Sequence, residues 1–157
     1  MKKFLITMFA ALAVTFAAQA QPRALGVTMG YNFDLSYQHQ VHNADFIELN
    51  LGSFGFDNLD LYAGYNFMIA QPAWTNRGEW GFYAGPGLAI GTGFDHGYEF
   101  SLGFTAQVGL EYTFWFPLQL AIDIRPRFGF IVSHEDVYFH ENGLFGFTPT
   151  LSVRYRF

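Results

Sequence analysis

The chain has 157 residues with thirteen acidic and eight basic side chains, a net charge of −5 and no cysteine. Nothing in it resembles a basic patch, which excludes nucleic acid as a partner. Aromatic residues make up 20% of the chain, with 20 Phe and 9 Tyr, more than an ordinary soluble core of this size uses. This composition fits the apolar band and aromatic girdles of a membrane β-barrel.

The N-terminal segment predicts export. Residues 1–3 carry both lysines of the chain, residues 4–18 are apolar, and Ala18-Gln19-Ala20 is a small-residue cleavage site. We therefore expect a signal peptide over 1–20 and a single barrel domain over 21–157. The alternative is an uncleaved anchor, although the apolar stretch is short for a spanning helix. Without the signal, six arginines stand against thirteen acids, a net charge of −7.

Apolar and polar residues alternate with period two through most of the remaining sequence. The run 24–41 is too long for one spanning strand of about 9–11 residues, so we expect a hairpin of strands 24–29 and 33–41 around a turn at 30–32. The fold class expected is all-β, an eight-stranded antiparallel up-and-down transmembrane β-barrel, because such barrels have an even number of strands. The other predicted strands are 45–54, 59–69, 80–91, 99–112, 118–131 and 144–157.

The polar face of these strands consists mostly of Gly, Ala, Ser and Thr. A soluble β-sandwich would also alternate, but we would expect a solvent face rich in Lys, Glu and Thr. Small residues suit the crowded inside of a narrow barrel, which favours the barrel. Within 80–91, Pro86 predicts a bend with a bulge or weak pairing. No helix follows Gly85-Pro86-Gly87, so it is not a phosphate loop, and no cofactor is expected.

The C-terminal strand sets the expected orientation, with Phe157 on the periplasmic side. The loops near 30–32, 53–58, 91–98 and 132–143 are then extracellular, and the connections 42–44, 70–79 and 113–117 are periplasmic. The connection 70–79 is long for a periplasmic turn. We expect Trp74, Trp80 and Trp115 to anchor the periplasmic interface, because Trp is enriched at membrane–water boundaries.

Charged residues also occupy inward positions of the predicted strands. Buried charges must be paired, so these side chains predict a polar plug, with a gated ion path as the alternative. In simple register, Asp123 lies near Arg154, and Gln119 lies between Glu111 and Arg156. The nine predicted interior charges are Asp34, Glu48, Asp60, Glu111, Asp123, Arg125, Arg127, Arg154 and Arg156.

The outer loops carry further reactive side chains, for which we expect an interaction role. His and carboxylates suit Zn or a similar ion, but their spacing matches no ligand frame, and no metal site is predicted. Ser133 and His134 are adjacent, so on a strand they face opposite sides and do not form a nucleophile–base pair. The interaction candidates are Asp95, His96, His134, Glu135, Asp136, His140 and Glu141.

Four segments resemble small outer-membrane β-barrels of the porin and OmpA/OmpX type from Gram-negative bacteria: Tyr83-Ala84-Gly85-Pro86-Gly87, Gly109-Leu110-Glu111-Tyr112, Asp123-Ile124-Arg125-Pro126 and Arg154-Tyr155-Arg156-Phe157. The resemblance implies location in the outer membrane, contact with lipid and lipopolysaccharide, and a monomer. It also implies insertion by the barrel-assembly machinery, with Tyr155 and Phe157 as its signal.

These expectations favour a non-enzymatic role in envelope structure or surface interaction, with a side-chain-plugged lumen. Two alternatives stay open. One is a narrow porin-like channel for small solutes. The other is a lipid A-modifying enzyme, because some eight-stranded outer-membrane barrels have that activity.

Overall fold

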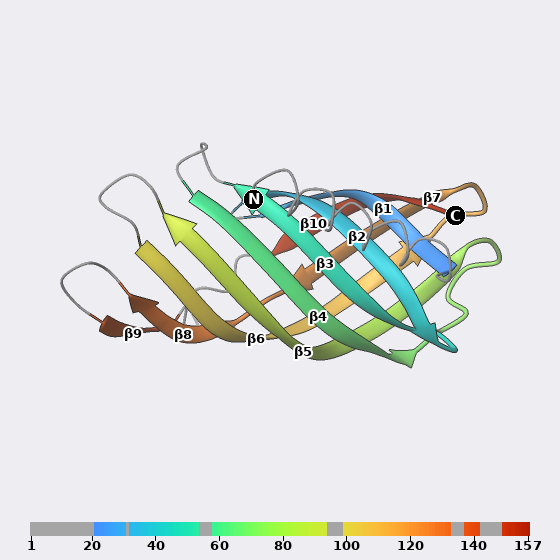
Figure 1. Ribbon diagram of the computed structural model, residues 1–157. Helices are drawn as coiled ribbons and strands as arrows, with labels where there is room; N and C mark the ends of the chain where they lie inside the picture. Colours follow the sequence, from blue (N-terminus) through green and yellow to red (C-terminus); the bar gives the residue numbers. More distant parts are fainter. Residues whose placement is uncertain (1–20, 31, 54–57, 94–98, 133–136, 142–148) are drawn as a thin grey trace.

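The computed structural model describes residues 21–30, 32–53, 58–93, 99–132, 137–141 and 149–157. The described residues contain no helix long and apolar enough to cross a membrane. Their regular structure is ten strands in one antiparallel sheet (Figure 1). The strands are β1 Gln21–Met29, β2 Phe33–His42, β3 Asp45–Ser53, β4 Asn58–Ala70, β5 Glu79–Gly93, β6 Glu99–Thr113, β7 Leu118–Ile124, β8 Arg127–Val132, β9 Val137–Glu141 and β10 Thr150–Arg156.

The sheet closes into a barrel. Neighbouring strands pair in chain order from β1 to β6, β6 pairs with β7 and β8, and β10 pairs with both β7 and β1. Counting β7 and β8 as one strand, the described ring has eight strands. The predicted antiparallel eight-stranded barrel is therefore confirmed, including the N-terminal hairpin of β1 and β2.

A proline separates β7 from β8 within the predicted strand 118–131. Val108 of β6 pairs with Ile124, and Thr105 pairs with Arg127, so the register with β6 is the same on both sides of the break. Pro126 has no N–H to donate to the ladder, but its carbonyl accepts from Ala106 N at 3.2 Å. The break thus removes a donor without displacing the strand.

One predicted loop is wrong in part. The region 132–143 was expected to be a loop, but β9 lies within it and pairs with β8. Among the described residues β9 has no other strand neighbour, so it lies outside the ring. Val137 and Phe139 continue an apolar alternation, and the Phe139 ring lies 5.4 Å from Phe130, so cross-strand aromatic packing extends the hairpin. The last strand begins at Thr150, whereas the predicted strand begins at residue 144. Residues 144–148 lie outside the described ranges.

Pro86 weakens the pairing of β5 on one edge. On the other edge it pairs with Ala106 of β6 in unbroken register. The ladder with β4 omits Gly85 and Pro86 and resumes at Ala84 in the same register. The predicted weak pairing is confirmed, and the register shift between β4 and β5 lies elsewhere, near Met68.

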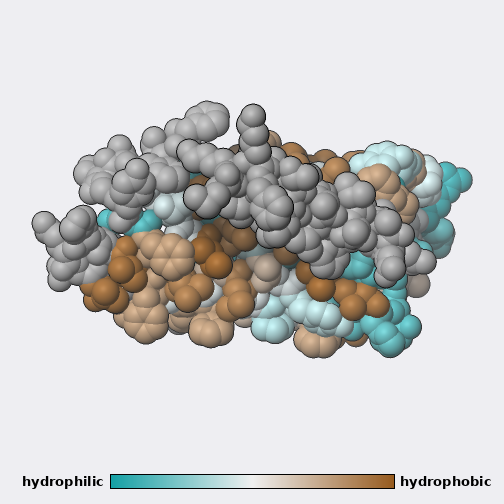
Figure 2. Space-filling model, viewed as in Figure 1, coloured by the Kyte–Doolittle hydropathy of each residue, from teal (hydrophilic) through white to brown (hydrophobic). Residues whose placement is uncertain are grey.

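The distribution of polarity is inverted relative to a water-soluble protein. Among the described residues, sixteen buried side chains are polar or charged and six are hydrophobic, whereas thirty large hydrophobic side chains are exposed. On β6, for example, Phe104 is 74% exposed while Gln107 is fully buried. Figure 2 shows hydrophobic surface extending along the side of the barrel, and hydrophilic residues at the end that carries Phe157. We call the end of the barrel that carries Phe157 the C-terminal end.

Aromatic rings form a chain at the C-terminal end. The ring centroid of Trp80 lies 5.4 Å from that of Trp74 and 4.7 Å from that of Tyr112. The ring centroids of Tyr112 and Phe114 lie 4.6 Å apart. The long connection between β4 and β5 is held against this chain, because Trp80 Nε1 donates to Thr75 at 3.2 Å. The Tyr112 hydroxyl also donates to the carbonyl of residue 77 at 2.9 Å. These contacts account for a connection longer than a tight turn.

Candidate functional site

Glu48, on β3, is the centre of the barrel interior. Its side chain is fully buried, and its Oε1 accepts from Arg154 Nη2 at 2.9 Å and from Arg125 Nη2 at 2.8 Å. Gln38 and Asn50 donate to the same carboxylate at 3.1 and 3.0 Å. These donors come from β2, β3, β10 and the β7–β8 junction, so one carboxylate ties together strands that are not neighbours in the ring.

Asp123 is held by Arg125 rather than by the predicted Arg154. Arg125 Nε and Nη2 donate to its two oxygens at 2.6 and 3.0 Å, and the Tyr83 hydroxyl donates at 3.1 Å. In the ladder Asp123 pairs with Thr150, four residues from Arg154. Arg154 instead reaches across the lumen to Glu48, so a prediction from strand neighbours alone selected the wrong partner.

The second buried ion pair joins Arg23 and Glu111. Arg23 was not predicted to face inward, because strict alternation from Leu25 assigns it to the outer face. A register shift between Pro22 and Ala24 reverses that parity, and both Arg23 and Ala24 are buried. The Arg23 guanidinium also lies 4.1 Å from the centroid of the Phe46 ring, a cation–π contact.

Gln119 contacts one of its two predicted neighbours, Glu111, but it does not pair with the other, Arg156. Its Nε2 donates to Glu111 at 3.1 Å, but it pairs across the ladder with Arg154, not Arg156. Arg156 lies at the C-terminal mouth, where it donates to Thr113 at 2.8 Å and lies 3.8 Å from Glu79.

We call six interior residues the plug, of which Arg125 is half-buried and the other five are buried: Arg23, Glu48, Glu111, Asp123, Arg125 and Arg154. They comprise three carboxylates and three guanidiniums, so their charges balance. Burying such groups is unfavourable unless every charge is paired and hydrogen-bonded. Here each acid accepts from at least one arginine of the plug.

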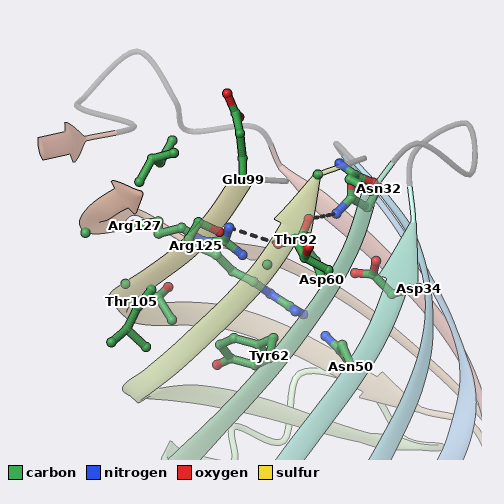
Figure 3. Close-up of a pocket in the computed structure, with 18 of the residues that line it drawn as sticks. Asn32, Asp34, Asn50, Asp60, Tyr62, Thr92, Glu99, Thr105, Arg125 and Arg127 are labelled. Atoms are coloured by element: carbon green, nitrogen blue, oxygen red, sulfur yellow. Dashed lines mark hydrogen bonds and ion pairs between the residues drawn. The ribbon is translucent and has the colours of Figure 1, made fainter. Parts of the chain in front are cut away.

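Beyond the plug, at the end of the barrel away from Phe157, the lumen opens into a cavity of about 630 Å³. Figure 3 shows side chains that line it. We call this cavity the vestibule. Arg127 Nη1 donates to Asp60 at 3.2 Å, and Asn32 Nδ2 donates to the same carboxylate at 2.9 Å. Arg125, a member of the plug, also lines the vestibule. The polar lining includes Asn32, Asp34, Asn50, Asn58, Asp60, Thr92, Glu99, Ser101, Thr105, Arg125, Arg127 and Thr150.

A glycine allows the position of Asp34 at the vestibule wall. Gly52 of β3 pairs with Asp34 on one side and with Asp60 on the other. A Cβ atom at Gly52 would overlap the Asp34 carboxylate. The absence of a side chain at Gly52 therefore allows the Asp34 carboxylate to lie over the β3 backbone.

All nine predicted interior charges have side chains on the lumen side of the barrel. They are divided between plug, vestibule and C-terminal mouth. Glu48, Glu111, Asp123 and Arg154 belong to the plug, Arg125 to plug and vestibule, Asp34, Asp60 and Arg127 to the vestibule, and Arg156 to the mouth.

The predicted assembly and interaction residues have different locations. Tyr155 and Phe157 lie on the exterior, 55% and 66% exposed, with ring centroids 5.3 Å apart. Of the predicted loop residues, Asp95, His96, His134, Glu135 and Asp136 lie outside the described ranges, as does Ser133 of the enzyme alternative; His140 and Glu141 belong to β9.

Among the described residues, no group of three or more His, Cys, Asp or Glu side chains could hold a metal ion. The closed strand pairing and the plug together define a closed antiparallel β-barrel with a charged, buried interior. In comparisons with known proteins, no family model, no curated protein and no solved structure matches the chain.

Proposed function

We propose that this protein is an integral outer-membrane β-barrel with a closed lumen and a non-enzymatic role in envelope structure or surface interaction. In this proposal it is exported, inserted by the barrel-assembly machinery, and surrounded by lipid and lipopolysaccharide. The observation that carries the proposal is the inverted polarity of the barrel, apolar outside and charged inside.

Lipid is the environment in which this surface is stable. Burying one Leu or Phe side chain contributes about 1.5–3 kcal/mol, and soluble monomers rarely expose apolar patches beyond a few hundred Å². Thirty large hydrophobic residues on the outside of one barrel far exceed that pattern. The closed ladder satisfies backbone groups between strands, as a spanning segment requires. The aromatic chain at the C-terminal end supports placing that end at an interface.

The plug favours a closed lumen over a channel, because the buried side chains of Glu48 and Arg154 join β3 and β10, which are not neighbours in the ring, through the lumen. The refolded protein should therefore give no steady conductance in a planar bilayer. Folding is checked by a difference in gel mobility between boiled and unboiled samples. Discrete openings that change in the Arg125→Ala variant would instead support the porin-like alternative.

A further inference from the structure

The two halves of the lumen differ in charge balance. The plug contains equal numbers of acids and arginines. The vestibule contains three acids, Asp34, Asp60 and Glu99. One of them, Asp60, forms an ion pair with Arg127, which also lines the vestibule. Arg125 is already shared between two plug carboxylates. The vestibule therefore has a surplus of about two negative charges among its described residues, and a low-dielectric wall focuses such a field on cations.

Arg125 and Arg127 act on the Asp34 carboxylate electrostatically, but neither of them binds it directly. Asp34 makes neither a hydrogen bond nor an ion pair with the described residues, and its Oδ1 is buried. A buried acceptor without a donor is unfavourable and calls for an explanation, such as a ligand or water. Figure 3 shows the Asp34 side chain beside the vestibule, near Asp60.

Two amide oxygens on the same wall also lack donors. Asn32 donates its Nδ2 to Asp60, and Asn50 donates its Nδ2 to Glu48, so these bonds fix which amide atom is the free acceptor. The Oδ1 atoms of both residues are buried with no donor among the described residues. Asn50 is only 1% exposed and lines the vestibule floor. Three oxygens from the turn before β2, from β2 and from β3 thus need donors.

A suitable ligand must bring both positive charge and N–H donors. A bare metal ion fits poorly, because no metal-ligand cluster exists among the described residues. A primary ammonium group carries one positive charge and three donors. A volume of about 630 Å³ lies within the range of small-molecule pockets.

We propose that the vestibule binds a small organic cation with primary ammonium groups, with Asp34 as its main charge partner and the amides of Asn32 and Asn50 beside it. This inference concerns the lumen alone and does not depend on where the barrel is located in the cell.

The test uses the full chain refolded in non-ionic detergent, with 1,4-diaminobutane as the probe. NMR follows the side-chain amide signals of Asn32 and Asn50 during titration. We expect saturable shifts with the diamine and none with 1,4-butanediol, which has the same length without charge. The Asp34→Asn variant should weaken binding roughly tenfold to a hundredfold, because a charge-assisted hydrogen bond is lost.

Asp45→Asn is the matched control. It makes the same change of charge at the first residue of β3, at the other end of that strand from Gly52 and away from the vestibule, where Asp45 accepts from Met68 N at 2.9 Å. Its diamine affinity should equal that of the parent chain. Unchanged binding in Asp34→Asn, equal binding of the diol, or shifts with Ca²⁺ and none with the diamine would each overturn the proposal. Gel mobility of unboiled samples verifies that each variant is folded.

Discussion

The Glu48→Ala variant is expected to lose about 3–5 kcal/mol of folding free energy, because removing one partner leaves buried charges uncompensated. Arg154 is 1% exposed, and Arg125 also depends on the same carboxylate oxygen. The loss is measured by urea titration in detergent micelles, with tryptophan fluorescence and the folded gel band as two readouts.

Two further variants make the Glu48 experiment interpretable. Glu48→Gln keeps the shape and an acceptor oxygen, so it should be less destabilised than Glu48→Ala and allows a measurement if the alanine variant does not fold. Glu99→Ala removes an acid that makes no hydrogen bond or ion pair among the described residues, so its stability should change by no more than about 0.5 kcal/mol. Similar unfolding midpoints for Glu48→Ala and Glu99→Ala would contradict a central role for Glu48.

The Leu49→Arg variant should destabilise the barrel in a lipid bilayer by about 2–4 kcal/mol, the effect of an arginine on the lipid face near the bilayer centre. Leu49 lies in the middle of β3, is 41% exposed, and pairs with Tyr37 and Ala63. On a surface facing water the same substitution would cost little. The measurement is urea unfolding from liposomes.

Val41→Arg is the control for depth in the membrane. Val41 is 46% exposed and lies near the end of β2, next to the turn that leads into β3. If the barrel spans a membrane as proposed, this position lies close to the interface, and an arginine there should cost about 0–1 kcal/mol. Equal, small effects at both positions would contradict a lipid-facing exterior.

The course of most strands could be predicted from the sequence, because alternation has a physical cause at every residue. Outward side chains are mostly apolar and inward ones are mostly small or polar, and β2 to β6 follow the predicted parity. The hairpin of β1 and β2 followed from strand length and the even-number rule. β9 was missed because its short apolar alternation lies among charged residues in an expected loop.

The contacts inside the barrel could be predicted only in part. Alternation shows which charges face inward, but it does not show which ones meet across the lumen. Arg154 selects Glu48 because barrel closure brings β3 and β10 together through the interior, although they are not neighbours in the ring. Arg23 was missed because a local register shift reverses its face. The position of the Asp34 carboxylate depends on Gly52 as its partner across the ladder, which requires the pairing register.

The most direct test of the membrane-barrel account is spin-label accessibility in liposomes. The chain has no cysteine, so single-cysteine variants carry one label each. Labels would be placed at outward positions 59, 61, 63, 65 and 67 of β4 and at Ser101, which lines the vestibule. The account predicts that outward labels collide with oxygen and are shielded from a water-soluble nickel complex, whereas the label at position 101 meets the complex. Outward labels that collide freely with the nickel complex would contradict it.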